Sequence, residues 1–132
     1  MALRISSCVI ALIQRAAAEA APLEACGILF GDGAVERASV AANVSDEPAR
    51  RFEIDPAALI AALKAERAGG EQVIGYWHSH PSGDATPSTI DAAMAAEDGK
   101  IWVIVAGETV TVWRSGANGL HGRFERVELA ST

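Results

Sequence analysis

The sequence predicts an α/β fold in which a single-domain mixed β-sheet is flanked by about three helices. Residues 5–20 and 55–68 carry the three-and-four spacing of apolar residues that is typical of amphipathic helices. Short apolar segments typical of buried strands alternate with these helices, and the C-terminal third contains mainly strand patterns. A chain of 132 residues has room for one core, so we expect one domain over residues 1–132.

The first predicted helix begins after Ser6 or Ser7, either of which can cap it. Its apolar stripe consists of Ile5, Val9, Leu12, Ile13, Ala16 and Ala20. Pro22 ends this helix. Residues 25–30 are typical of a short buried strand, and after a Gly-Asp-Gly turn we expect residues 34–43 to return as the second arm of a hairpin.

The second predicted helix has both a start and a stop signal. Asp55 can cap it, Pro56 suits its first position, and a Gly-Gly pair at residues 69–70 stops it. Residues 45–50, before this helix, are expected to form a surface loop. The remaining elements are a strand at 73–78, a helix from Pro87 or Ser88 to Glu97, and strands at 101–105, 109–113 and 124–129, the last at the edge of the sheet.

Composition narrows the classes of function. Half of the residues are hydrophobic, and the formal net charge is -6. Because no cluster of Lys or Arg stands out to neutralise phosphates, we expect no nucleic-acid partner. The first eighteen residues only loosely imitate a signal peptide, because their apolar run is short and Gln14-Arg15 interrupts it. No apolar run reaches the ~18 residues that span a bilayer, so we expect no membrane partner. Two cysteines, Cys8 and Cys26, outside any CxxC pair, favour a reducing cytoplasm.

Two of the three histidines lie in the segment His78-Ser79-His80, at the end of a predicted strand. Residues two apart on a strand project to the same face about 6.5 Å apart. Both imidazoles can therefore reach one ion at the roughly 2.0–2.1 Å of a zinc–nitrogen bond. Taken alone, such a pair is more often a surface or packing feature. We assign the isolated His121 to that class.

A third candidate ligand is Asp91, three residues after Ser88 at the start of the next predicted helix. Ser-x-x-Asp is also the signature of a capping box, and Thr86-Pro87 is an alternative cap. Two histidines and an aspartate, with water in the fourth position, form an open, catalytic type of zinc site. The conjunction of a strand end, a loop and a helix start favours this interpretation over either motif alone.

The carboxylate of Glu24 and the thiol of Cys26 face the same side of a predicted buried strand. An ionised carboxylate is costly there without a partner. The Cys26 thiol is conceivable as a nucleophile or a fourth ligand, but free cysteine is usually a small buried apolar residue, and we favour that interpretation.

These residues resemble the signature of the JAMM (MPN+, Mov34/PAD-1) zinc metallopeptidase family, and the similarity is closest to short prokaryotic JAB-type members. The resemblance extends over Pro22-Leu23-Glu24-Ala25-Cys26-Gly27-Ile28-Leu29-Phe30-Gly31, Phe52-x-Ile54-Asp55-Pro56 and Gly75-Tyr76-Trp77. It implies a JAMM/MPN (cytidine-deaminase-like) fold, with His78, His80 and Asp91 as ligands of one zinc ion per chain. It also implies that Glu24 is the general base and that Ser88 donates a hydrogen bond to the developing oxyanion.

The resemblance further implies cleavage of a peptide or isopeptide bond after the Gly-Gly tail of a ubiquitin-like or sulfur-carrier protein. Three other interpretations stay open. The segment around His80 also resembles RadC-type proteins, although these carry a further helical domain. A non-catalytic MPN-type interaction module normally lacks the ligands, and a zinc-dependent deaminase needs a Pro-Cys-x-x-Cys segment that this sequence does not contain.

Overall fold

The structure is a computed structural model that describes residues 2–131. Seven strands form one mixed sheet: β1 (Ala2–Ile5), β2 (Cys26–Phe30), β3 (Arg37–Ala38), β4 (Val73–Ser79), β5 (Ile101–Ala106), β6 (Thr109–Leu120) and β7 (Phe124–Ser131). Their spatial order is β1-β7-β6-β5-β4-β2-β3, with parallel pairing in β1·β7 and β4·β5. The helices are α1 (Ser7–Ala20), α2 (Pro56–Arg67) and α3 (Thr89–Met94). The predicted mixed sheet with three helices is confirmed.

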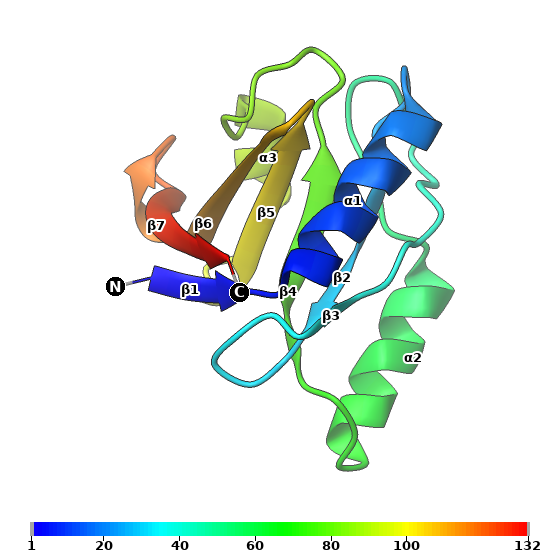
Figure 1. The fold of residues 1–132 in the computed structure, drawn as a ribbon, viewed down its shortest axis with the longest axis vertical. Coiled ribbons are helices and arrows are strands. Elements are labelled where there is room, and N and C mark those ends of the chain that lie inside the picture. Colours follow the sequence, from blue (N-terminus) through cyan, green and yellow to red (C-terminus); the bar gives the residue numbers. More distant parts are fainter. Residues whose placement is uncertain (1, 132) are drawn as a thin grey trace.

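Both faces of the sheet are covered, and β5 shows why its sequence is apolar throughout. Its odd-numbered residues, such as Val103, pack with residues of α1 such as Val9 and Ile13. Its even-numbered residues, such as Trp102, pack with residues of α2 and α3 in a second core. A strand buried on both faces needs no polar alternation. Figure 1 shows α1 in front of the central strands and α3 behind them.

The helix ends follow the local signals. The Ser6 side chain caps α1 by accepting a hydrogen bond from the Cys8 amide. Asp55 caps α2 in the same way, with Pro56 in the first turn. After α2, Gly69 adopts a positive φ of 93°, a conformation that glycine enters without steric cost. The predicted boundaries of these two helices are therefore close to the observed ones.

Five expectations are corrected. Ile5 belongs to β1 and not to the first helix, and because β1 pairs with β7, the strand from Phe124 is not at the sheet edge. The expected hairpin arm at 34–43 contains only the two-residue strand β3, and Val35, Ala41 and Asn43 otherwise form isolated bridges. The third helix ends at Met94 and not at Glu97, because Ala95 is extended and buried. The expected strand at 109–113 continues to Leu120 as β6.

The sheet brings the ends of β2 and β4 together. The two strands are antiparallel, and Cys26 lies opposite His78. The start of β2 is therefore beside the end of β4, and the loop that leaves β4 leads to α3. Among residues 2–131, none of the helices combines the length and apolar character that a bilayer span requires.

Candidate metal centre

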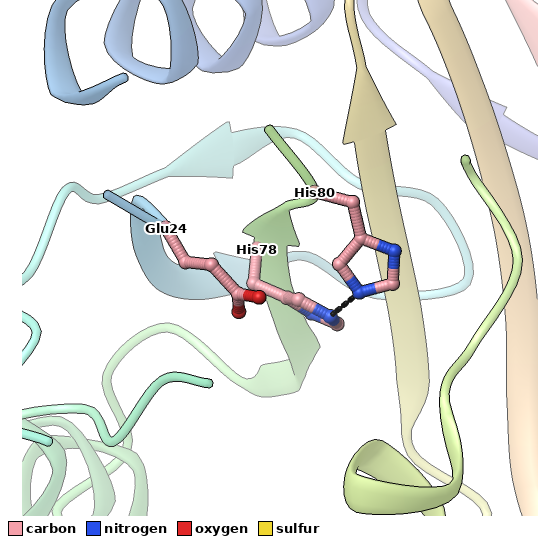
Figure 2. A group of neighbouring side chains, drawn as sticks. All are labelled: Glu24, His78 and His80. Carbon is pink, nitrogen blue, oxygen red and sulfur yellow. Dashed lines mark hydrogen bonds between the residues drawn. The ribbon is translucent and has the colours of Figure 1, made fainter. Parts of the chain in front are cut away.

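The two histidines point to the same face of β4, and their Nε2 atoms are 3.0 Å apart. His78 is fully buried and its ring stacks on Phe52, with centroids 4.3 Å apart. His80 is 7% exposed. Figure 2 shows the two imidazoles converging, with the Glu24 side chain reaching toward them from the chain that leads into β2. The strand geometry thus brings together the pair that the sequence predicts.

Asp91 completes a triangle of donor atoms. Its Oδ1 lies 3.2 Å from His78 Nε2, and its Oδ2 lies 3.0 Å from His80 Nε2. Ligands of a tetrahedral ion held at roughly 2.0–2.1 Å are separated from one another by about 3.3 Å. The three observed separations are close to that value, so the donor set fits a single small divalent ion.

Backbone contacts prepare the donors for this role. The Nδ1 atom of His80 lies 2.7 Å from the Asp84 carbonyl oxygen. Because a carbonyl only accepts, Nδ1 carries a hydrogen, and Nε2 is the ring nitrogen left to bind a proton or a metal ion at the centre. Burial lowers the pKa of His78 and thereby favours its neutral form. Two imidazole Nε2 atoms and a carboxylate therefore converge.

The ring of His80 and the carboxylate of Asp91 show that the centre attracts positive charge. Burial acts to lower the pKa of His80, but its hydrogen bonds with Asp91 and the Asp84 carbonyl and the charges of Asp91 and Glu24 together raise it. Burial likewise acts to raise the pKa of Asp91, but hydrogen bonds with His78 and His80 lower it overall. A carboxylate that stays ionised while almost completely buried needs a positive charge beside it. A protonated imidazole or a metal ion can supply that charge.

The capping box at the start of α3 and the donor triangle share the same atoms. Ser88 Oγ accepts from the Asp91 amide at 3.0 Å, and Asp91 Oδ2 accepts from the Ser88 amide at 2.9 Å. The predicted capping box is thus confirmed beside the donor triangle, and the two interpretations do not exclude each other. The box fixes the carboxylate that faces the histidines.

Glu24 lies close to the histidines but outside the donor triangle. One of its carboxylate oxygens lies within 4.8 Å of a nitrogen of His78 and of His80, but it forms no ion pair or hydrogen bond with them among residues 2–131. Its Oε1 atom is buried without a hydrogen-bond partner. Burial raises the pKa of Glu24 to about 7; His80 opposes this rise, and Asp91 adds to it. The Glu24 carboxyl can therefore exchange a proton near neutral pH.

The surroundings of two other candidates from the sequence, Cys26 and His121, indicate structural roles. Cys26 is fully buried, and burial raises the pKa of its thiol to about 12, which agrees with a small buried residue and not with a thiolate. His121 contacts the Pro87 carbonyl at 3.0 Å through Nε2 and is not part of the donor triangle. It supports the loop that precedes Ser88.

Several residues that support the site have no role that the sequence predicts. Asp84 acts through its backbone carbonyl, which no residue type reveals. Phe52 belongs to a segment that resembles the family, and Asn43 lies in the strand expected over residues 34–43. The side chain of Asn43 instead joins several backbone segments beside Glu24. An Asn in an expected strand, where this residue type is rare, was the available signal.

A cleft of about 340 Å³ opens onto the site. Its lining includes Glu24, His80 and Ser88 as well as the exposed loop residues Arg50 and Thr86. Three of the candidate residues therefore border an open cleft, while His78 and Asp91 lie buried and do not line it.

Comparison with known proteins relates this site to a family. A family model described as prokaryotic homologues of the JAB domain matches residues 6–116. Desampylase of Haloferax volcanii is 36% identical over 86 residues, which cover 63% of this chain and 62% of that protein. A probable TtuB-protein conjugate cleaving protease of Thermus thermophilus is 41% identical over 71 residues, covering 54% of this chain and 48% of that protein. The matches span less than two thirds of either relative.

Solved structures share the fold. The solution structure of protein DSY2949 from Desulfitobacterium hafniense has a TM-score of 0.83 and 26% identity, covering 98% of this chain and 92% of that one. A JAB1/MPN domain protein from Archaeoglobus fulgidus has a TM-score of 0.63 and 23% identity, covering 97% and 99%. The second likeness concerns the fold alone, and it agrees with the expected JAMM/MPN architecture.

Proposed function

Because this chain belongs to the family of prokaryotic JAB-domain homologues, we propose that it is a zinc-dependent metallopeptidase. Its substrate is a peptide or isopeptide bond that follows the Gly-Gly tail of a ubiquitin-like or sulfur-carrier protein. The observation that carries the proposal is the convergence of three metal-type donor residues beside the carboxyl of Glu24, whose Oε1 has no hydrogen-bond partner within residues 2–131. The names of the two curated relatives, a desampylase and a conjugate-cleaving protease, support the substrate class.

His78, His80 and Asp91 would hold one zinc ion per chain, with water as the fourth ligand. When bound, zinc lowers the pKa of water toward about 7 and polarises the carbonyl group under attack. The chain fixes the donors in advance: Asp84 orients His80, Phe52 packs on His78, and the capping box orients Asp91. Little reorganisation is then needed on binding.

Glu24 is the general base. Its carboxyl lies near the imidazoles, and its pKa of about 7 suits proton exchange at neutral pH. It takes a proton from the attacking water and returns it to the leaving amine. Because no group within residues 2–131 forms a hydrogen bond with Oε1, this oxygen is available for the water.

Ser88 stabilises the negative charge that develops on the substrate carbonyl oxygen. Its Oγ accepts from the Asp91 amide, so the hydroxyl hydrogen stays available, and it donates to no group within residues 2–131. Ser88 also lines the open cleft beside His80. A donor placed where charge develops contributes to catalysis in proportion to how well it is held, and the helix cap holds this one.

The Gly-Gly tail suits an approach from the open cleft, since glycines let the substrate backbone come close to the site. We place the protein in the cytoplasm, which agrees with two cysteines that remain unpaired in the described residues. Donor residues at all three ligand positions favour the enzyme over a non-catalytic module of the same fold.

The direct test uses a small carrier protein that ends in Gly-Gly. The carrier is joined to a reporter once through a peptide bond and once through a lysine isopeptide bond, and cleavage is followed by mass spectrometry. We expect release of the carrier with a free terminal glycine, loss of activity with a chelator, and recovery with added zinc. A carrier whose last glycine is replaced by alanine is the matched control and should be cleaved poorly.

Two results would contradict the proposal. A purified protein that takes up no stoichiometric zinc supports the non-catalytic module instead. Cleavage that continues at full rate with a chelator excludes a metal-dependent reaction.

A further inference from the structure

The peptide group that joins Glu24 to Ala25 is held by a side chain on each side. Asn43 Nδ2 donates to the Glu24 carbonyl oxygen at 2.9 Å. The Ala25 amide donates to Ser79 Oγ at 2.8 Å, and this hydrogen bond is buried. The carbonyl and amide of one peptide plane are thus bound by two side chains that come from different segments of the chain.

Asn43 can hold its position because its amide group is bound at both ends. Nδ2 donates to the Arg51 carbonyl at 3.2 Å in addition to that of Glu24. Oδ1 accepts from the amides of Ser45 and Glu53, both at 3.1 Å. Since carbonyls only accept and amides only donate, the side chain has a single orientation that satisfies all four groups.

Ser79 connects this peptide to the strand of the histidines. It lies between His78 and His80 in the sequence, and in a strand its side chain points to the opposite face. Ser79 is only 2% exposed. A second hydrogen bond, from the Ser79 amide to the Ala25 carbonyl at 3.0 Å, strengthens the link. The segment that carries Glu24 is therefore tied to the strand that carries two donors.

The Glu24 side chain depends on its backbone for position. No hydrogen bond within residues 2–131 holds its carboxylate, and Oε1 is buried without a partner. The direction in which the side chain leaves the main chain is set by the peptide plane that follows it. A shift of about 1 Å in a reacting group can lower a rate roughly 100-fold.

We propose that Asn43 and Ser79 are positioning residues that clamp the Glu24–Ala25 peptide and thereby aim the Glu24 carboxyl at the metal centre. The inference rests on the proposed function, in which Glu24 is the general base. Neither side chain touches the reacting atoms. Their contribution is to keep the base at a fixed distance from the His78 and His80 donors.

The test measures steady-state cleavage by the Ser79→Ala and Asn43→Ala variants at a temperature where circular dichroism shows each to be folded. We expect kcat to fall roughly 10- to 100-fold, with KM within about twofold of wild type and zinc content unchanged. Because both side chains hold one peptide, the double variant should lose less than the product of the single losses.

Two further variants separate positioning from a general loss of stability. Ser79→Thr keeps the hydroxyl, and the residue lines a hollow of about 190 Å³ beside α1 that has room for a methyl group, so most of kcat should return. Ser115→Ala removes another hydroxyl from a 2% exposed residue, which binds Asp98 and Lys100 near the opposite end of the sheet. This control should keep the wild-type kcat.

A readout that needs no activity is the amide hydrogen exchange of Ala25, followed by NMR in the zinc-free protein. Ser79→Ala should raise its exchange rate roughly tenfold or more while leaving the Val103 amide in β5 unchanged. An unchanged Ala25 rate overturns the clamp.

The kinetic outcomes are also decisive. Cleavage by wild type and by both alanine variants at equal kcat overturns the inference alone, as does a fall that is explained by lost zinc or that Ser79→Thr does not reverse. Absence of cleavage by the wild-type protein overturns the proposed function, and the inference with it.

Discussion

Replacing Glu24 with glutamine removes a charge while keeping the size of the side chain. Burial raises the pKa of this carboxyl from its usual 4.5 to about 7. This difference corresponds to at most about 3 kcal/mol, since each tenfold change in an equilibrium is worth about 1.4 kcal/mol and solvent screening at the cleft reduces the cost. The cost falls on the folded, metal-free protein, because only there is the ionised group buried.

The sign of the pH dependence follows from the direction of this change. Below pH 4.5 the carboxyl is protonated in both the folded and the unfolded state, so it costs nothing. As pH rises toward about 7, the unfolded state ionises first and the folded state loses up to about 3 kcal/mol relative to it. Glu24→Gln should therefore stabilise the zinc-free protein at pH 8 by about 1–3 kcal/mol. The lower end of this range applies if the buried glutamine amide also lacks a hydrogen-bond partner, which costs free energy as well.

Urea unfolding in the presence of a chelator, at pH 8 and at pH 4.5, measures this gain. A gain of 1–3 kcal/mol moves the midpoint by about 1 M for a protein of this size. The control is Glu19→Gln, an exposed position where we expect less than about 0.5 kcal/mol at either pH. The same Glu24→Gln protein should bind zinc normally and lose roughly 10²–10⁴-fold in kcat.

Three results would each refute part of this reasoning. If Glu24→Gln is no more stable than wild type at pH 8, the Glu24 carboxylate is not a buried, unpaired charge that destabilises the folded protein. An equal gain at both pH values assigns the effect to something other than ionisation. Retained kcat removes Glu24 as the general base, and lost zinc makes it a ligand.

Three further predictions concern the ligands, the cap and the thiols. His80→Ala should abolish stoichiometric zinc binding, measured by mass spectrometry of metals, whereas His121→Ala should retain the ion; a zinc-loaded His80→Ala protein contradicts the ligand set. Ser88→Ala should lower kcat roughly 10²–10³-fold and the free energy of unfolding by about 0.5–2 kcal/mol, because the same hydroxyl caps α3 and faces the cleft. A loss of stability with unchanged kcat would mean that Ser88 only caps the helix and has no part in catalysis. A thiol reagent should modify the exposed Cys8 in the native protein, and Cys26 only after denaturation, because Cys26 is buried with its pKa raised to about 12; two fast thiols in the native protein contradict that burial.

The parts of the fold that the sequence predicts well are those whose signals are local. The cap and proline at Asp55-Pro56 determine where α2 starts, and the apolar run of β5 follows from burial on both faces. The parts that the sequence analysis missed depend on distant partners. Residues Ala2–Ile5 form a strand because they pair with residues 128–131 at the other end of the chain, and four residues carry too little pattern to show this.

The site divides in the same way. Donor residues such as His78 and His80 can be predicted because few residue types bind metal and their spacing on a strand is fixed. Asp91 could be predicted only as either a cap or a ligand, and the structure shows that its carboxylate both completes the capping box and faces the histidines. The supporting contacts could not be predicted, because the hydrogen bonds of Asn43 join backbone atoms whose proximity is a product of the whole fold.

The most direct test of the central claim is anomalous diffraction at the zinc edge from crystals of the zinc-loaded protein. We expect one zinc peak at roughly 2.0–2.1 Å from His78 Nε2 and His80 Nε2 and at a similar distance from an Asp91 oxygen. Glu24 should lie beyond bonding distance of the metal. A peak elsewhere, or one bonded to Glu24 in place of Asp91, would contradict the account.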